Sequence, residues 1–277
     1  GYLSDNLSLT SLYLNNQTLL AGDALSINSG LRYDNHEKAG GNTTGMIGAA
    51  WDIRRHGLIL RGNYGSAFRA PSIYEVFSAS GNPALDPETS TTGELGVEKY
   101  DSRGRYRIGL SWWHSEVKDA IIWVLQNPAT YSGQYMNVDK LNSRGVELEI
   151  KAHPLPHWQA GFNYTYTESW KLNYSAGVWS RNVQLPRNKF NLNLAWLHPK
   201  GGSIALDGYW VDGSRLRWNG IEKTDGYFKL DLTGRCPLGR GFTGVLALRN
   251  VLDEDYFESL GYREAGFQAF AGLEYRY

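Results

Sequence analysis

Side chains that could perform covalent or metal chemistry are few in this sequence of 277 residues. His153 and His157 have the i, i+4 spacing of a helical metal site, but Pro154 and Pro156 forbid a helix there, so we expect turn residues. Cys236 is the single cysteine, which excludes an intrachain disulfide and a cysteine-based metal cluster. Neither a G-x-S-x-G nucleophile motif nor a G-x-x-x-x-G-K-[ST] phosphate loop occurs. We therefore expect no enzyme, no metal site and no cofactor.

Composition indicates which elements must position any binding residue. The chain has 28 basic and 28 acidic residues, so its net charge gives no reason to expect nucleic acid or an anionic membrane surface as a partner. Aromatic residues make up 13% of the chain, glycine is abundant, and helical periodicity is almost absent, which favours β structure. The longest strictly apolar run, from Ala120 to Leu125, is far shorter than the roughly 20 residues of a membrane-spanning helix. Strands are expected to carry the fold.

Alternation of apolar and polar residues with a period of two identifies these strands. Near the end of the chain, every second residue from Phe267 to Tyr277 is apolar or aromatic, and the residues between them include glutamine, glutamate and arginine. The same pattern recurs at residues 25–34, 106–112, 146–151, 189–196 and 228–235. Each strand thus has one apolar face and one polar, often charged, face. A water-soluble β-sandwich and a membrane β-barrel both show this pattern.

Strand length and connections decide between these two folds. The runs are about 10 to 18 residues long, whereas sandwich strands are usually shorter. Tight turns are expected at residues 21–23, 55–57, 102–104, 154–156, 199–202 and 237–240. Long loops are expected at residues 38–44, 69–89, 126–134, 173–187, 219–226 and 251–265. This rhythm predicts an all-β fold, a transmembrane antiparallel β-barrel with about 13 strands between Leu7 and Tyr277. Bacterial single-chain barrels have even strand counts, so we expect something else to complete this one.

Two motifs resemble one known family. Phe68-Arg69-Ala70-Pro71, followed by Asn82-Pro83-Ala84-Leu85-Asp86-Pro87-Glu88, resembles the "F-[RK]-A-P … N-P-x-L-x-P-E" signature of TonB-dependent outer-membrane receptors. The segment from Asn250 to Tyr256 is similar to the family's "N-[VL]-[FL]-D-x-x-Y". The last strand ends on the aromatic Tyr277, similar to the signal read during outer-membrane insertion. The resemblance covers essentially the whole chain.

The resemblance implies a fold and a set of partners. In the family, a 22-stranded barrel encloses an N-terminal plug, in keeping with plugged outer-membrane transporters. Residues 1–277 would supply the C-terminal part of such a barrel, without the plug, the energy-coupling box that binds TonB, or the first nine or so strands. The implied location is the bacterial outer membrane. The implied partners are outer-membrane lipid and lipopolysaccharide, a plug and barrel half from a separate chain or fragment, and the TonB complex acting through that plug.

The resemblance also implies a function, which is active transport of a small-molecule metal chelate. The stretch Gly261-Tyr262-Arg263-Glu264-Ala265-Gly266 is similar to a "G-Y-x-x-x-G" stretch of cobalamin receptors, so cobalamin is the favoured ligand. An iron-carrying siderophore is second. Haem receptors of this family carry a histidine between the halves of the signature, and residues 72–81 contain none. The alternatives are a passive porin-like channel and a structural barrel half completed by a partner chain.

Aromatic side chains in the long loops are the candidate ligand contacts, because bulky and partly apolar chelates are held by aromatic and polar groups. They are Tyr74, Phe77, Tyr131, Tyr135, Tyr174, Trp179, Trp218 and Tyr262. The alternative for each is that it packs only its own loop. The signature residues have a structural alternative as well, because Pro71, Pro83 and Pro87 fix the backbone and Asn82 suits a turn. Arg69, at a strand end, is expected to face the lumen and pair with a carboxylate of the plug.

Overall fold

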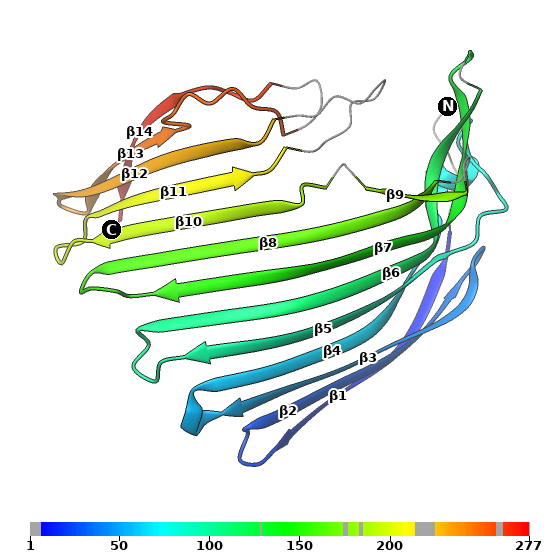
Figure 1. Ribbon diagram of the computed structural model, residues 1–277, viewed down its shortest axis with the longest axis horizontal. Coiled ribbons are helices and arrows are strands. Elements are labelled where there is room, and N and C mark those ends of the chain that lie inside the picture. The colour runs from blue at the N-terminus through cyan, green and yellow to red at the C-terminus, as the bar shows by residue number, and fades with distance from the viewer. Residues whose placement is uncertain are drawn as a thin grey trace.

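One antiparallel sheet dominates the computed structural model, which describes residues 7–127, 129–173, 177–182, 185–213, 225–258 and 263–276. The sheet follows the chain from β1 to β8 and then from β10 to β14, while the short β9 pairs with β8 (Figure 1). Every pairing is antiparallel. The predicted all-β antiparallel fold is confirmed, and the main path of the sheet holds the 13 predicted strands.

The strands vary widely in length. Their bounds are β1 Leu9–Leu20, β2 Leu25–His36, β3 Gly40–Ile53, β4 Leu58–Arg69, β5 Glu88–Tyr100, β6 Tyr106–Asn127, β7 Ser132–Ala152, β8 Trp158–Asn173, β9 Val178–Arg181, β10 Asn188–Leu197, β11 Ser203–Val211, β12 Tyr227–Gly239, β13 Phe242–Arg249 and β14 Gln268–Tyr275. Among the described residues, two short helices interrupt the strands, η1 (Arg54–His56) and α1 (Ile73–Phe77). No helix in the described ranges is long and apolar enough to cross a membrane.

The register of the ladders places the alternating residues on two consistent faces. On one face, which we call the apolar face, Leu31 pairs with Leu14, and Leu110 pairs with both Val97 and Leu148. On the other, the polar face, Arg61 lies beside Glu94 and Arg107 beside Glu98, with shortest N–O separations of 3.4 and 3.2 Å. A slip of one residue would exchange the faces, so the sequence pattern itself holds the register.

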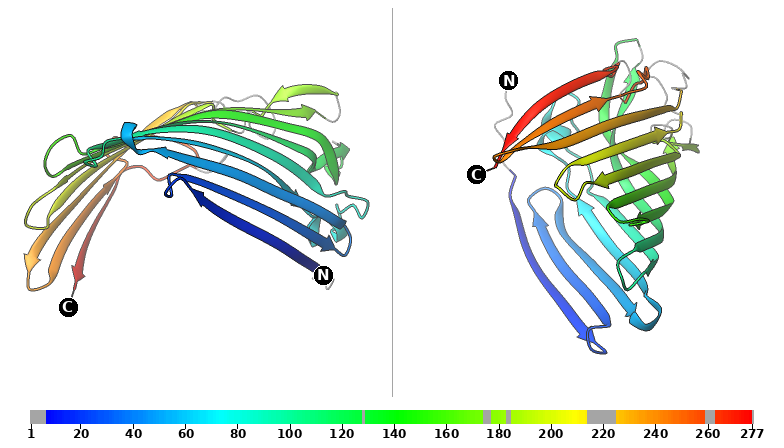
Figure 2. Two further views of the ribbon diagram at one scale, coloured as in Figure 1. Left: turned by 90° about the horizontal axis from the view of Figure 1, so that it is seen from below. Right: turned by 90° about the vertical axis from the view of Figure 1, so that its left-hand side faces the viewer.

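A buried core between two layers is missing from the described part of the chain. The buried apolar residues there are Val76, Ile121, Val211, Tyr227 and Tyr256, all in or near loops, whereas Leu12 and Leu14 on the apolar face are 75% and 72% exposed. A β-sandwich would cover that face with a second sheet. The sheet is instead a single curved layer whose first and last strands form separate edges (Figure 2).

The connections follow the predicted alternation, except that β9 lies inside the loop predicted at residues 173–187 and that three other predicted connections have different ends. The loop predicted at residues 38–44 is a turn at 37–39, and β3 begins at Gly40. The loop predicted at 126–134 is short, because β6 and β7 continue pairing to Asn127 and Ser132. The turn predicted at 237–240 begins later, because a register shift lets β12 continue to Gly239. In each case ladder hydrogen bonds extend a strand through residues whose local composition favours a loop.

Candidate functional site

The residues between β4 and β5, numbers 70–87, form a loop that we call the signature loop. Its ends are fixed by the ladder, since Arg69 is the register partner of Glu88. The Arg69 guanidinium donates two hydrogen bonds of 2.7 Å to the Glu88 carboxylate and three of 3.0–3.2 Å to the Glu75 carboxylate. Glu88 also accepts the backbone N–H of Ile121 on β6 at 2.6 Å. Arg69 therefore has two carboxylate partners within this chain, and its expected pairing with a plug carboxylate stays a prediction.

Helix α1 begins inside this loop with a capping box. Ser72 Oγ accepts the backbone N–H of Glu75 at 3.3 Å, and the Glu75 carboxylate accepts the backbone N–H of Ser72 at 2.7 Å. Burial raises the pKa of Glu75, but hydrogen bonds from Arg69 and Ser72 outweigh it, so its pKa lies below the usual 4.5. At the far side of the helix Gly81 is required, because a Cβ there would lie 2.5 Å from the carbonyl oxygen of Val76.

The signature loop also docks against β7. The backbone N–H of Tyr135 donates to the Ser80 carbonyl at 3.0 Å, and the Asn82 amide donates to the Tyr135 carbonyl at 3.1 Å. Asn137 accepts the Asp86 N–H and donates to the Asp86 carbonyl, both at 2.9 Å. The long pairing of β6 with β7 thus builds the surface on which the loop rests. The Asn82 side chain thus bonds within the fold: its amide donates to β7, and its Oδ1 accepts the backbone N–H of Ala84 at 3.0 Å.

This docking brings two predicted ligand contacts together. The rings of Tyr74 on α1 and Tyr135 on β7 meet edge to face with centroids 6.1 Å apart, and Tyr74 is 61% exposed. Phe77, on the same helix, is half-buried. Tyr131 is exposed at the tip of the β6–β7 hairpin, and Trp179 is exposed on β9, at the same end of the sheet as that tip (Figure 1).

Other predicted residues are less informative about a ligand. Tyr174, Trp218, Tyr262 and the chain-terminal Tyr277 lie outside the described residues. In the signature, Pro71 is buried and Pro83 is exposed, while Phe68, Ala70, Leu85 and Pro87 are half-buried. Within the described ranges, no three His, Cys, Asp or Glu side chains gather to form a metal site.

The second family motif anchors the loop after β13. Asn250 is only 2% exposed, and its amide donates to the carbonyls of Glu254 and Ala265 and accepts the N–H of Glu254, with distances of 2.9, 3.2 and 2.9 Å. Its own N–H donates to Asp231 on β12 at 2.8 Å. Tyr256 then packs on Tyr227 with ring centroids 4.5 Å apart. This segment folds its loop back over the polar face.

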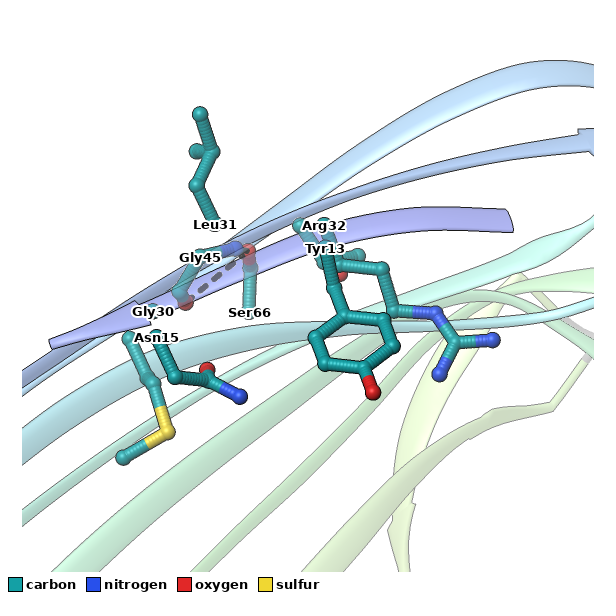
Figure 3. Close-up of a pocket in the computed structure, with 9 residues that line it drawn as sticks. Tyr13, Asn15, Gly30, Leu31, Arg32, Gly45 and Ser66 are labelled. Atoms are coloured by element: carbon teal, nitrogen blue, oxygen red, sulfur yellow. Dashed lines mark hydrogen bonds between the residues drawn. The ribbon is translucent and has the colours of Figure 1, made fainter.

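Two polar pockets lie farther along the polar face. One, of about 350 Å³, is lined by Tyr13, Asn15 and Arg32 at the β1 edge; these side chains point to one side of the sheet and Leu31 to the other (Figure 3). The other, of about 370 Å³, lies on β8 and β10–β12 and includes Asn163, Asn191 and Lys229 among its lining residues. Both combine hydrogen-bonding and charged groups with about as much apolar surface.

Several residues that shape the site were not singled out from sequence. The S-x-x-E spacing of Ser72 and Glu75 was a usable signal for the capping box. Asn137 and Gln134 carry no such local signal, yet both bond to the signature loop, Gln134 through the Gly81 carbonyl at 3.1 Å. Their role depends on contacts across more than 50 residues of chain.

The family model and the sequence relatives that match this chain agree on one family. The family model described as "TonB dependent receptor-like, beta-barrel" matches residues 1–251. The chain is 26% identical over 221 residues to the vitamin B12 transporter BtuB of Vibrio vulnificus (strain YJ016), covering 77% of this chain and 34% of that protein. It is 25% identical over 188 residues to the ferric-pyoverdine BN7/BN8 receptor of Pseudomonas putida, covering 65% of this chain and 21% of that protein.

Solved structures share the fold. The siderophore receptor PirA of Acinetobacter baumannii superposes with a TM-score of 0.79 at 18% identity, covering 97% of this chain and 46% of that structure. The chain therefore spans about a third or less of the two sequence relatives and under half of this structural neighbour.

Proposed function

Because the chain belongs to the TonB-dependent receptor-like β-barrel family, we propose that it forms the wall and outer mouth of an active transporter for a metal chelate. Its relatives are outer-membrane β-barrel proteins of Gram-negative bacteria, and this chain shares that location. The apolar face contacts lipid and the polar face lines the lumen. The short turns lie on the periplasmic side and the long loops outside the cell. The family is one of receptors and transporters, so we propose no catalytic step for this chain.

The open sheet supports the proposed partners. β1 and β14 each have one side that pairs with no other described strand. Unpaired backbone groups have no water to bond in lipid, so further strands must cover both edges. We assign these strands, together with a plug inside the lumen, to a companion segment or chain. TonB acts through that plug, and the charged polar face supplies hydrogen bonds and ion pairs to it.

Our proposal for the ligand is based on the docked signature loop. Arg69, Glu88 and Asn137 hold the loop rigidly, and the loop holds Tyr74 against Tyr135 with one ring open to the outside. An ordered pair of aromatic rings suits a large, partly apolar chelate better than a small hydrated ion. We assign cobalamin as the first candidate ligand, and a ferric siderophore as the second. The similarity to a vitamin B12 transporter and to a ferric-pyoverdine receptor supports this class.

Uptake by the complete protein that contains this chain tests the proposal. Bacteria lacking their own cobalamin and siderophore receptors would express it and receive labelled cobalamin or labelled ferric siderophores. We expect saturable uptake of one of these ligands that disappears when TonB is deleted. Uptake that is unsaturable and independent of TonB would instead identify a passive channel.

Paired variants test whether Tyr74 and Tyr135 contact the ligand at the outer mouth of the barrel. Replacing Tyr74 and Tyr135 together by alanine is expected to weaken ligand binding about tenfold, since each aromatic contact contributes about 0.5–1.5 kcal/mol. The matched control replaces both by phenylalanine, which keeps the rings and removes only the hydroxyls. Equal affinities for the alanine and phenylalanine pairs would exclude this part of the mouth as the ligand site.

A further inference from the structure

The short turns of the sheet lie side by side along its periplasmic edge (Figure 1). They carry six Lys or Arg side chains and two Asp side chains, whereas the whole chain has zero net charge. This positively charged edge, which we call the basic rim, lies wholly within the described residues. Its turns comprise residues 21–24, 54–57, 101–105, 153–157, 198–202 and 240–241.

The carboxylates near the basic rim are already paired with other arginines. Asp101 accepts Arg105 at 2.8 Å, and Asp52 of β3 lies 3.5 Å from Arg54. Four further cations, each exposed and each on a different turn, have no carboxylate of the described residues within ion-pair distance. They are Arg55, Arg103, Lys200 and Arg240.

The backbone holds these cations at the tips of tight turns. Gly104 directly follows Arg103 and has a φ of 73°. Gly201 directly follows Lys200 and has a φ of 91°. Glycine adopts such left-handed conformations without steric cost, which lets the chain reverse within few residues. The Lys200 backbone N–H also donates to Nδ1 of His198 at 3.2 Å. The charged side chains therefore project from ordered backbone.

Strand spacing sets the distances between the four cations. Neighbouring strands are about 4.8 Å apart, so neighbouring hairpin turns are about 10 Å apart along the rim. Arg55 and Arg103 occupy neighbouring turns. So do Lys200 and Arg240, on the other side of the β7–β8 turn. The row thus extends over roughly 40 Å. A small anion cannot bridge these positions, whereas a long polymer with repeated acidic groups can.

The cations lie beyond the aromatic side chains at the membrane boundary. Trp51 is on the apolar face, four residues before Arg55. Trp196 is on the same face, four residues before Lys200. Aromatic residues of outer-membrane barrels gather at the edges of the apolar band. The basic rim therefore faces the water of the periplasm, which favours a partner in that compartment over the lipid acyl region.

We propose that the basic rim binds peptidoglycan, a polymer of the periplasm whose peptides carry free carboxylates. Each of the four cations forms an ion pair with a different carboxylate, and the four contacts together give an affinity that a single exposed pair does not. Such binding anchors the barrel wall to the cell wall. This inference rests on the periplasmic orientation in the proposed function, but not on which chelate is transported.

The test is co-sedimentation of the full-length protein, purified in mild detergent, with purified peptidoglycan sacculi. The rim variant combines Arg55→Gln, Arg103→Gln, Lys200→Gln and Arg240→Gln. It is expected to bind about 16-fold more weakly than the wild type, or about twofold for each cation, as for exposed ion pairs.

A matched control removes the same number of positive charges from the opposite end of the sheet. It combines four substitutions of exposed lysines, Lys38→Gln, Lys118→Gln, Lys140→Gln and Lys171→Gln. This control should bind sacculi like the wild type, because its lysines lie on the extracellular side. A loss of binding as large as that of the rim variant would show that only net charge matters and would overturn the proposal.

A second probe identifies the group that is recognised. Sacculi whose carboxylates have been amidated should bind the wild type and the rim variant equally weakly. Salt at about 1 M, where the Debye length is about 3 Å, should have the same effect on untreated sacculi. The proposal is overturned if the rim variant keeps wild-type affinity, if amidation leaves binding unchanged, or if the four cations bind only vesicles of phosphatidylglycerol.

The sedimentation assay needs neither chelate nor TonB, so it is read separately from uptake. A protein that binds sacculi through the basic rim but transports nothing would contradict the proposed function and leave this assignment standing. A protein that transports a chelate but does not bind sacculi would do the reverse.

Discussion

Arg69 at the end of β4 and Glu88 at the start of β5 are register partners whose side chains share two hydrogen bonds of 2.7 Å. The pair closes the signature loop at its base, and further hydrogen bonds from Arg69 to Glu75 connect helix α1 to it. A motif that sequence alone could assign to ligand contact or to loop structure is here a structural clamp. The clamp fixes the loop on which Tyr74 meets Tyr135.

Replacing Arg69 by alanine is expected to loosen the signature loop without unfolding the sheet. Arg69 is nearly half exposed, so solvent screening limits the loss to about 1 kcal/mol of local stability. Hydrogen exchange of the backbone amides between residues 70 and 87 would measure it. The control is Arg105→Ala, which removes an arginine–aspartate pair at the opposite end of the barrel wall. Unchanged exchange in the signature loop of Arg69→Ala would contradict the clamp.

Acidification is expected to open the same loop. Burial raises the pKa of Glu75 but the bonds from Arg69 and Ser72 lower it more, so the folded pKa lies below the usual 4.5. A carboxylate whose pKa is lower in the folded state contributes its full stabilisation above pH 4.5. This contribution is lost as the pH falls through the folded pKa. Exchange at residues 72–77 should therefore rise below about pH 4.5. In Glu75→Gln the added pH dependence should disappear; its persistence would assign the effect to another group.

Asn250 is expected to control the last described loop. Changing it to aspartate keeps the shape but removes the two donated hydrogen bonds and sets a carboxylate beside the carbonyls of Glu254 and Ala265. We expect a loss of about 2 kcal/mol or more in local stability, because the group is buried. Limited proteolysis should then cut between residues 251 and 265 faster than in the wild type. The control is Asn250→Gly, because glycine adopts the positive φ of 48° at this position without strain. Its effect therefore comes from the lost side-chain hydrogen bonds and not from backbone strain.

The assignment of the two faces can be measured with spin labels. After Cys236→Ser, a single cysteine is introduced at Leu232 on the apolar face or at Thr233 on the polar face, two adjacent positions of β12. A label at position 232 should collide more with oxygen dissolved in lipid, and a label at 233 more with a water-soluble nickel complex. Equal accessibilities at the two positions would contradict the register.

The sequence by itself determined the strands and their faces, because side-chain alternation is a local property with a period of two. Residues 106–112 and 146–151 could be assigned to apolar and polar faces without knowing that they pair. The family and its location were equally readable, since motifs such as Phe68–Pro71 are contiguous. The predicted count of about 13 strands followed from the same alternation.

Only the tertiary structure decided which side chains meet. The contact of Tyr74 with Tyr135 and the carboxylate partners of Arg69 depend on the register of long ladders and on loop docking. The loop expected at residues 126–134 was wrong for the same reason, because cross-strand hydrogen bonds between β6 and β7 outweigh the turn-forming residues near the tip. Local patterns fix which way a side chain points, and pairing between distant segments fixes what it touches.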